Sequence, residues 1–389
     1  MRRISAALIL IFFILSVACK GGGARGVPPS ETLPFNDISA FDLIRNINVG
    51  WNLGNALDAR YDSGTAHTST VRALETAWGN PQTTKANIDA IKTAGFNAVR
   101  IPVTWHKVID SEYNIRADWM ERVTEIVNYA SLNDMYVILN TYHDENLFVL
   151  SDKMMPQTEK AFIRIWQQIA ENFKNYDEKL MFEAMSAPRI FDSPDEWNSD
   201  NTEGIKNLNT LNQIFVDTIR NTGGSNEKRI LIITTFISSL SGPAVDSFIL
   251  PKDTAADKLI IAVRGFIPYN FTHNPGGGWS STWSKSFLGD TVEIDETLSI
   301  IENLFISRGV PVIIIEMGAI NRNNNDSRAE WAEYFVSRAK ERNIPCFWWD
   351  NGVTELSTAT REGFGIFNRS SNKVEHEEII DALLRGAGE

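Results

Sequence analysis

The sequence predicts a single (β/α)8 barrel of the α/β class, because short apolar runs alternate with helical patterns and eight of those runs suit buried parallel strands. A chain of 389 residues with 43% hydrophobic residues is long enough to form such a barrel as one domain. Residues 35–389 show no break in composition, so we assign them to the barrel. The expected strands are Asn48–Leu53, Ala98–Pro102, Tyr136–Thr141, Leu180–Ala184, Ile230–Thr234, Leu259–Val263, Val312–Ile315 and Pro345–Trp349.

Helical patterns occupy most of the intervals between these strands. The interval Ser238–Asp257, between the fifth and sixth strands, has the weakest helical pattern, and Glu375–Leu384 is expected to form the last helix of the barrel. The clearest helices are expected at Lys85–Ala94, Trp119–Asn133, Glu159–Phe173, Ile205–Asn221, Glu293–Arg308 and Arg328–Glu341.

The first 18 residues have the pattern of an export signal. Arg2 and Arg3 precede an apolar stretch, Ala6–Leu15, that is too short to span a membrane stably, and small residues end at Ala18. We therefore expect residues 1–18 to be removed during export.

The cysteine that follows, Cys19, stands where a bacterial lipoprotein is acylated, although Ser16 occupies the position where leucine is usual. The other cysteine, Cys346, falls inside an apolar strand and would be a poor disulfide partner for a flexible tail. We expect Cys19 to be lipidated and residues 20–34 to be a flexible tether. The protein is then a lipid-anchored component of the bacterial cell envelope; ordinary secretion is the alternative.

Net charge restricts the partners. A formal charge of −12 argues against nucleic acid, because binding phosphates requires a basic surface, whereas a neutral polysaccharide is indifferent to it. No cofactor is expected. No metal site is expected either, because His67, His106, His273 and His376 lack the spacing of metal ligands. We expect a monomer.

Polar residues gather where the expected strands end, which is where (β/α)8 barrels place their chemistry. Glu316 ends a long apolar run, and an unpaired carboxylate there is costly unless it faces a polar cleft. The residues expected at the strand ends are Asn52, Asn55, Arg100, Trp105, His143, Asp144, Glu145, Ser186, Arg264, Glu316, Trp348 and Trp349.

Eight motifs run in order from about Phe35 to the C-terminus. They are GWNLGNALDA (50–59), WGNP (78–81), GFNAVRIPVTW (95–105), YVILNT (136–141), FEAM (182–185), IPYNF (267–271), PVIIIEMGA (311–319) and CFWWDNG (346–352). Together they resemble glycoside hydrolase family 5, in particular its endo-β-1,4-glucanase and xyloglucanase branch.

The resemblance implies a retaining mechanism, in which one carboxylate attacks the anomeric carbon and a second carboxyl group protonates the leaving oxygen. Glu316 matches the nucleophile. The family's acid/base is the glutamate of an Asn-Glu-Pro segment, but the matching residues here are Ser186, Ala187 and Pro188. The acid/base is therefore missing at Ala187.

Four further cleft positions depart from the family pattern. Ser186 replaces the asparagine beside the acid, Tyr142 replaces a histidine after the third strand, and Arg264 and Phe266 replace the histidine and tyrosine after the sixth. We expect Arg264 to pair with Glu316 and hold it ionised. The family's substrate-binding positions fall on Asn52, Asn55, Arg100, Trp105, His143 and Trp349, with Trp348 as an alternative to the last.

Three functions remain open. The first is a pseudoenzyme that binds a β-linked polysaccharide or oligosaccharide, such as a β-glucan or xyloglucan, with Trp78, Trp279 and Trp283 as further candidates for stacking on sugar rings. The second is an active glucanase whose acid has moved to Asp144 or Glu145. Glu183 is excluded, because four residues of strand put it about 13 Å deeper in the barrel. The third is an adhesion or scaffold protein that uses the barrel exterior.

Overall fold

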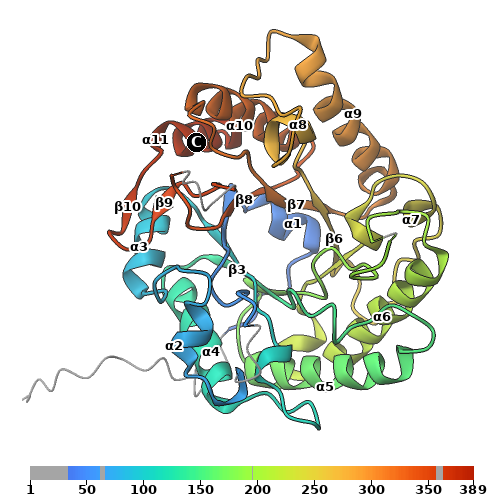
Figure 1. The fold of residues 1–389 in the computed structure, drawn as a ribbon. Helices are drawn as coiled ribbons and strands as arrows, with labels where there is room; N and C mark the ends of the chain where they lie inside the picture. The colour runs from blue at the N-terminus through green and yellow to red at the C-terminus, as the bar shows by residue number, and fades with distance from the viewer. Residues whose placement is uncertain (1–33, 62–65, 195, 356–361) are drawn as a thin grey trace, which may run out of the picture.

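The computed structural model describes residues 34–61, 66–194, 196–355 and 362–389. These residues form a barrel of strands inside a ring of helices (Figure 1). The expected export signal (residues 1–18), the expected lipidation at Cys19 and residues 20–33 of the tether lie outside the described residues. Within the described residues, no helix has the length and apolar character needed to cross a membrane.

Eight strands pair in chain order, all parallel, and the last pairs with the first, so the predicted closed barrel is confirmed. Each strand begins and ends within two residues of its expected bounds. Most are rich in valine and isoleucine, which suit strands buried on both faces. The strands are β1 (Val49–Leu53), β2 (Ala98–Ile101), β3 (Tyr136–Asn140), β4 (Leu180–Glu183), β5 (Leu231–Thr234), β6 (Leu259–Arg264), β7 (Val312–Met317) and β8 (Cys346–Asp350).

The helices that cover the barrel lie close to the expected intervals, and the weak interval after β5 yields only short helices. The α-helices are α1 (Ala40–Arg45), α2 (Val71–Glu75), α3 (Lys85–Thr93), α4 (Ala117–Ser131), α5 (Met155–Phe173), α6 (Thr202–Arg220), α7 (Pro243–Asp246), α8 (Tyr269–Thr272), α9 (Leu288–Leu304), α10 (Asn325–Lys340) and α11 (Glu377–Ala387). The 3-10 helices are η1 (Ala66–Thr68), η2 (His106–Val108), η3 (Gly224–Glu227), η4 (Phe236–Ser238) and η5 (Ile306–Arg308), and a small antiparallel pair joins β9 (Phe367–Asn368) to β10 (Lys373–Val374).

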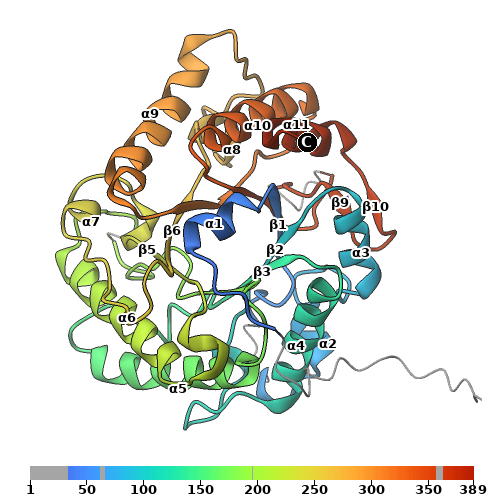
Figure 2. The same cartoon turned by 180° about the vertical axis from the view of Figure 1, so that it is seen from behind.

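The amino end of the barrel is closed by α1, which crosses it when the molecule is seen from behind (Figure 2). Leu43, Ile44 and Ile47 pack there against strand residues such as Ile138 and Ile313. This apolar plug leaves the opposite, carboxyl end of the strands for polar side chains. Cys346, in β8, is a buried free thiol in this interior.

A β-bulge disturbs the pairing of β6 with β7. Val263 lies opposite Ile314, but the next residue, Arg264, lies opposite Glu316, so one residue of β7 is skipped. Bulges at barrel rims redirect side chains. This one puts Arg264 directly beside Glu316.

Candidate active site

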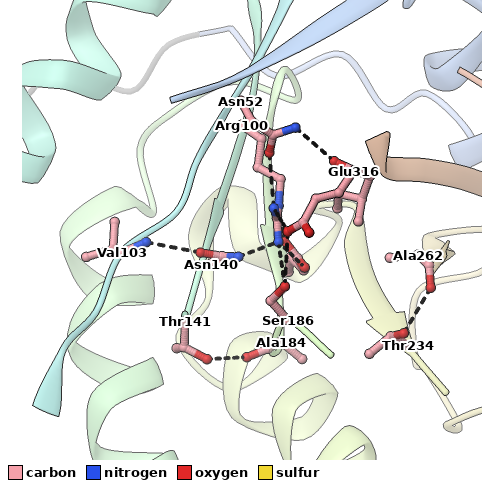
Figure 3. A network of polar contacts seen from close by, with 12 residues as sticks. Asn52, Arg100, Val103, Asn140, Thr141, Ala184, Ser186, Thr234, Ala262 and Glu316 are labelled. Carbon is pink, nitrogen blue, oxygen red and sulfur yellow. Dashed lines mark hydrogen bonds and ion pairs between the residues drawn. The ribbon is translucent and has the colours of Figure 1, made fainter. Parts of the chain in front are cut away.

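Arg100 lies at the centre of the carboxyl end of the barrel (Figure 3). Its Nε and Nη2 donate to the two carboxylate oxygens of Glu183 at 2.6 and 2.8 Å, and its Nη1 donates to Glu316 Oε1 at 2.6 Å. The side chain is fully buried. One guanidinium group therefore joins β2 to β4 and β7, and holds both carboxylates by charge-assisted hydrogen bonds.

Glu316 is contacted by a second guanidinium group on its other oxygen. Arg264 Nε lies 3.1 Å from Glu316 Oε2, so the ion pair expected from the sequence is present. Burial alone would raise the pKa of Glu316, but the charges of Arg264 and Arg100 outweigh it and lower that pKa. The carboxylate is only 2% exposed. It is therefore held in its ionised form and shielded from solvent.

Ser186 connects the two guanidinium groups. Its Oγ accepts hydrogen bonds from Arg100 Nη2 at 3.0 Å and from Arg264 Nη2 at 3.2 Å, and it donates to Glu316 Oε1 at 3.3 Å. The hydroxyl that replaces the family's asparagine therefore completes the cluster around Glu316.

Ala187 is buried and adopts a positive φ of 40°, an uncommon conformation for a residue with a side chain. Beside it, a cavity of about 20 Å³ is lined by Ser186, Pro188, Arg189 and residues of the loop after β3. This volume accommodates about one water molecule. No carboxyl group is present at position 187 itself.

The ring of Tyr142 covers the cluster from the cleft. It stacks on Trp349 with centroids 5.8 Å apart and planes 13° apart, and it lies 5.3 Å from the guanidinium carbon of Arg100. His143 packs edge-on against Tyr142 at 4.5 Å. Trp349, rather than Trp348, is therefore the cleft tryptophan, since Trp348 is fully buried and donates to the carbonyl of Phe364.

The two carboxylates after β3 are occupied by structural contacts. Asp144 is buried and accepts hydrogen bonds from the backbone N–H groups of Trp105 and His106, at the start of η2, and lies 3.0 Å from His106 Nδ1. Glu145 lies between Arg60 Nη2 at 2.9 Å and Arg189 Nη2 at 2.8 Å. Neither presents a free carboxyl group to the cleft.

Glu145 is expected to make stability depend on pH. Burial works to raise its pKa, but the hydrogen bond from His143 and the charge of Arg189 outweigh it, and the pKa falls to about 2. Because this folded-state pKa lies below the ordinary value of 4.5, the stabilisation is present above pH 4.5 and is lost as the pH falls towards 2. Denaturant titrations of the wild-type protein should show the free energy of unfolding falling by about 2–3 kcal/mol over that pH interval. Glu145→Gln should not show this decrease. An unchanged pH profile in the variant would contradict the assignment.

Several residues expected to contact substrate have buried side chains in this structure. Asn52 donates to the carbonyls of Ile315 and Trp348 and accepts from Arg100, so it fixes the cluster instead of touching a ligand. Arg100 is likewise fully buried, and its N–H groups donate to Glu183, Glu316, Ser186 and Asn52. Trp105 and Trp283 are core residues, whose indole N–H groups donate to backbone carbonyls.

Other predicted residues keep some access to the cleft. Asn55 is half-buried in a turn with φ of 56°, and Phe266 packs on His273 and Phe364. Trp78 and Trp279 are 40% and 51% exposed. Sequence reasoning missed Arg60 and Arg189; an arginine immediately after Pro188 was the available signal. Within the described residues, no cluster of three or more histidine, cysteine or acidic side chains could hold a metal ion.

A closed (β/α)8 barrel with a glutamate at the end of β7, bound by an arginine from β2, has the frame of a retaining glycoside hydrolase. The model of the family described as cellulase (glycosyl hydrolase family 5) matches residues 61–355. The chain belongs to this family, as the motifs predicted.

Named relatives agree. Endoglucanase A of Clostridium longisporum is 39% identical over 98% of this chain and 71% of its own length, and endoglucanase A of Ruminococcus albus is 39% identical over 90% and 93%. The structure resembles a broad-specificity endoglucanase from Ruminococcus champanellensis with bound cellotriose. The superposition has a TM-score of 0.86 with 41% sequence identity, and it covers 90% of this chain and 100% of the endoglucanase chain.

Proposed function

We propose that this protein binds a β-linked glycan at the carboxyl end of the barrel and hydrolyses it little or not at all. The observation that supports this most directly is the state of Glu316, which two guanidinium groups bind while no carboxyl group stands at position 187. The glycan class is suggested by relatives that are endoglucanases and by a similar structure with cellotriose.

The chemistry of the departing sugar explains why one missing group matters. A sugar alkoxide is a poor leaving group, and a general acid typically contributes about 10²–10⁴ in rate. Here the acid is absent and the nucleophile is stabilised in its ionised, paired form. Both halves of the retaining mechanism are therefore impaired at once.

An active enzyme is the second candidate, favoured by the presence of Glu316 and by relatives that are endoglucanases. It requires an acid elsewhere. A general acid must hold a proton near neutral pH, and a pKa of about 2 leaves Glu145 without one. Asp144 is buried against backbone donors.

The test combines binding with an acid-independent reaction. We expect calorimetry to detect binding of cello- or xyloglucan oligosaccharides, and hydrolysis no faster than in a Glu316→Gln control. We also expect no burst of aryl alcohol from a β-cellobioside with an activated aryl leaving group, with or without azide, because this substrate needs no acid and tests Glu316 alone. Turnover above the control would establish the active enzyme. A lack of binding to any β-glycan would favour the scaffold function.

The location in the cell envelope is part of the same proposal. The signal-like residues 1–18 and Cys19 support lipidation. Cys19→Ser should abolish incorporation of labelled palmitate in a bacterial host. Incorporation that persists in the variant would refute lipidation at this cysteine.

A further inference from the structure

The guanidinium group of Arg264 has more donors than the protein uses. Its Nη2 donates to Ser186, while its Nε, although 3.1 Å from Glu316 Oε2, is not aligned for a hydrogen bond and has no hydrogen-bond partner. Among the described residues, Nη1 has no hydrogen-bond acceptor. The side chain is 25% exposed, and because Nε is buried beside Glu316, Nη1 is the donor that a ligand can reach.

The charges of the central cluster balance. Arg100 and Arg264 offset Glu183 and Glu316, and the neighbouring pair Arg60 and Arg189 offsets Glu145 and Glu196. A glutamate at position 187 would have left the cleft negative. With Ala187 and Arg264, the charges of these eight side chains sum to zero, so the cluster has no net negative charge, although Glu316 beside Arg264 stays ionised.

A second guanidinium group lies beyond the cluster, in the loop after β7. Arg322 donates to the carbonyls of Phe271 and Asn274 at 2.9 and 2.6 Å and has no carboxylate partner within the described residues. Its guanidinium carbon lies 5.2 Å from the ring of Trp279, which is half exposed. An exposed indole backed by an unpaired positive charge suits a sugar ring that carries a negative group.

The charges of Arg264 and Arg322 act on one shared neighbour. Burial lowers the pKa of His273, and both arginines lower it further, while Glu362 and Glu316 oppose them. Arg264 and Arg322 therefore both add positive potential around His273, which packs against Phe266. Glu362 and Glu316 are the acidic groups that reduce this positive potential.

We infer that the cleft selects an acidic glycan, namely a β-linked chain with hexuronate units, whose carboxylate binds the open N–H groups of Arg264. This inference rests on the proposed function and names its ligand class. A carboxylate can accept two parallel hydrogen bonds from one guanidinium group. A neutral sugar that covers Arg264 would remove water from these N–H groups. The hydroxyl groups of that sugar would replace the lost hydrogen bonds less well than a carboxylate does.

The overall charge of −12 does not oppose this selection strongly. Exposed charges more than about 10 Å apart are largely screened at 0.1 M salt, whereas a direct contact with a partly buried guanidinium group is not. Local geometry therefore decides the preference.

The experiment compares two ligands that differ only in the carboxylate. Calorimetry with a cello-oligosaccharide and with a β-1,4-linked glucuronate oligomer of the same length should show at least tenfold tighter binding of the glucuronate, the effect of about one charge-assisted hydrogen bond. Arg264→Gln should remove this preference, so that the two oligomers bind with similar affinity; the readout is the ratio of the two affinities within each protein, because the substitution also changes the pairing of Glu316. Circular dichroism confirms that the variant is folded.

The matched control is Arg45→Gln, which removes the same charge from α1 at the opposite end of the barrel and should keep the preference. Equal or tighter binding of the neutral oligomer by the wild-type protein would overturn the inference while leaving glycan binding intact. A preference that survives in Arg264→Gln would also overturn it. If neither oligomer binds, the proposed function itself fails.

Discussion

Replacing Arg100 with methionine is expected to lower the free energy of unfolding by about 3–5 kcal/mol, because it leaves buried carboxylates without their partner. Glu183 loses both of its guanidinium hydrogen bonds, and Glu316 keeps only Arg264. Methionine has a similar length, so packing is largely preserved. Urea denaturation of the purified protein at pH 7 provides the measurement.

The control for this substitution is Arg45→Met, which breaks an ion pair with Asp42 in which both side chains are more than half exposed. Such pairs contribute about 0–1 kcal/mol. The pKa of Glu316 is lowered in the folded state, so its pairing stabilises above pH 4.5 and ceases to do so as the pH falls through the folded-state pKa. The difference in the free energy of unfolding between the wild-type protein and Arg100→Met should therefore decrease as the pH is lowered. If Arg100→Met lowers the free energy of unfolding by less than about 1 kcal/mol at pH 7, Arg100 is not the main partner of Glu183 and Glu316.

Restoring the acid alone is expected to restore no hydrolysis. Ala187→Glu places a long side chain beside a cavity of about 20 Å³, and Arg264 still pairs with Glu316. The combined variant Ala187→Glu, Ser186→Asn, Tyr142→His, Arg264→His and Phe266→Tyr should gain at least about 10²-fold in reducing-sugar release from a soluble β-glucan.

Adding Glu316→Gln to this combined variant is the control, and it should abolish the gain. Activity in the single Ala187→Glu variant would show that the other four substitutions do not impair the site. A combined variant that binds glycan but stays inactive would place the defect elsewhere in the cleft.

Much of the fold could be predicted from the sequence, because every strand is a short apolar run, most of them rich in valine and isoleucine, and helices such as α4, α5 and α6 have a clear apolar stripe. The interval Ser238–Asp257, predicted to have the weakest helical pattern, contains only the four-residue α-helix α7. The residue types at the altered cleft positions also allowed one contact to be predicted. The ion pair expected between Arg264 and Glu316 is present.

The direction of side chains at the strand ends could not be predicted. Asn52, Arg100 and Trp105 all follow the pattern of cleft residues, yet strand tilt and register turn them into the interior. The bulge that aligns Arg264 with Glu316 has no clear signal in a single sequence. Arg60 and Arg189 come from separate loops, and only the folded chain brings them to Glu145.

The bridge from Glu183 through Arg100 to Glu316 has a consequence for how homologous genes are interpreted. Because it ties together three strands of the barrel, loss of Glu316 would leave Arg100 partly unpaired in the protein interior, whether or not any substrate is ever cleaved. The glutamate of β7 can therefore persist long after turnover has ceased. In this chain the retention of Glu316 is explained by the stability of the barrel, so its presence does not by itself indicate hydrolytic activity.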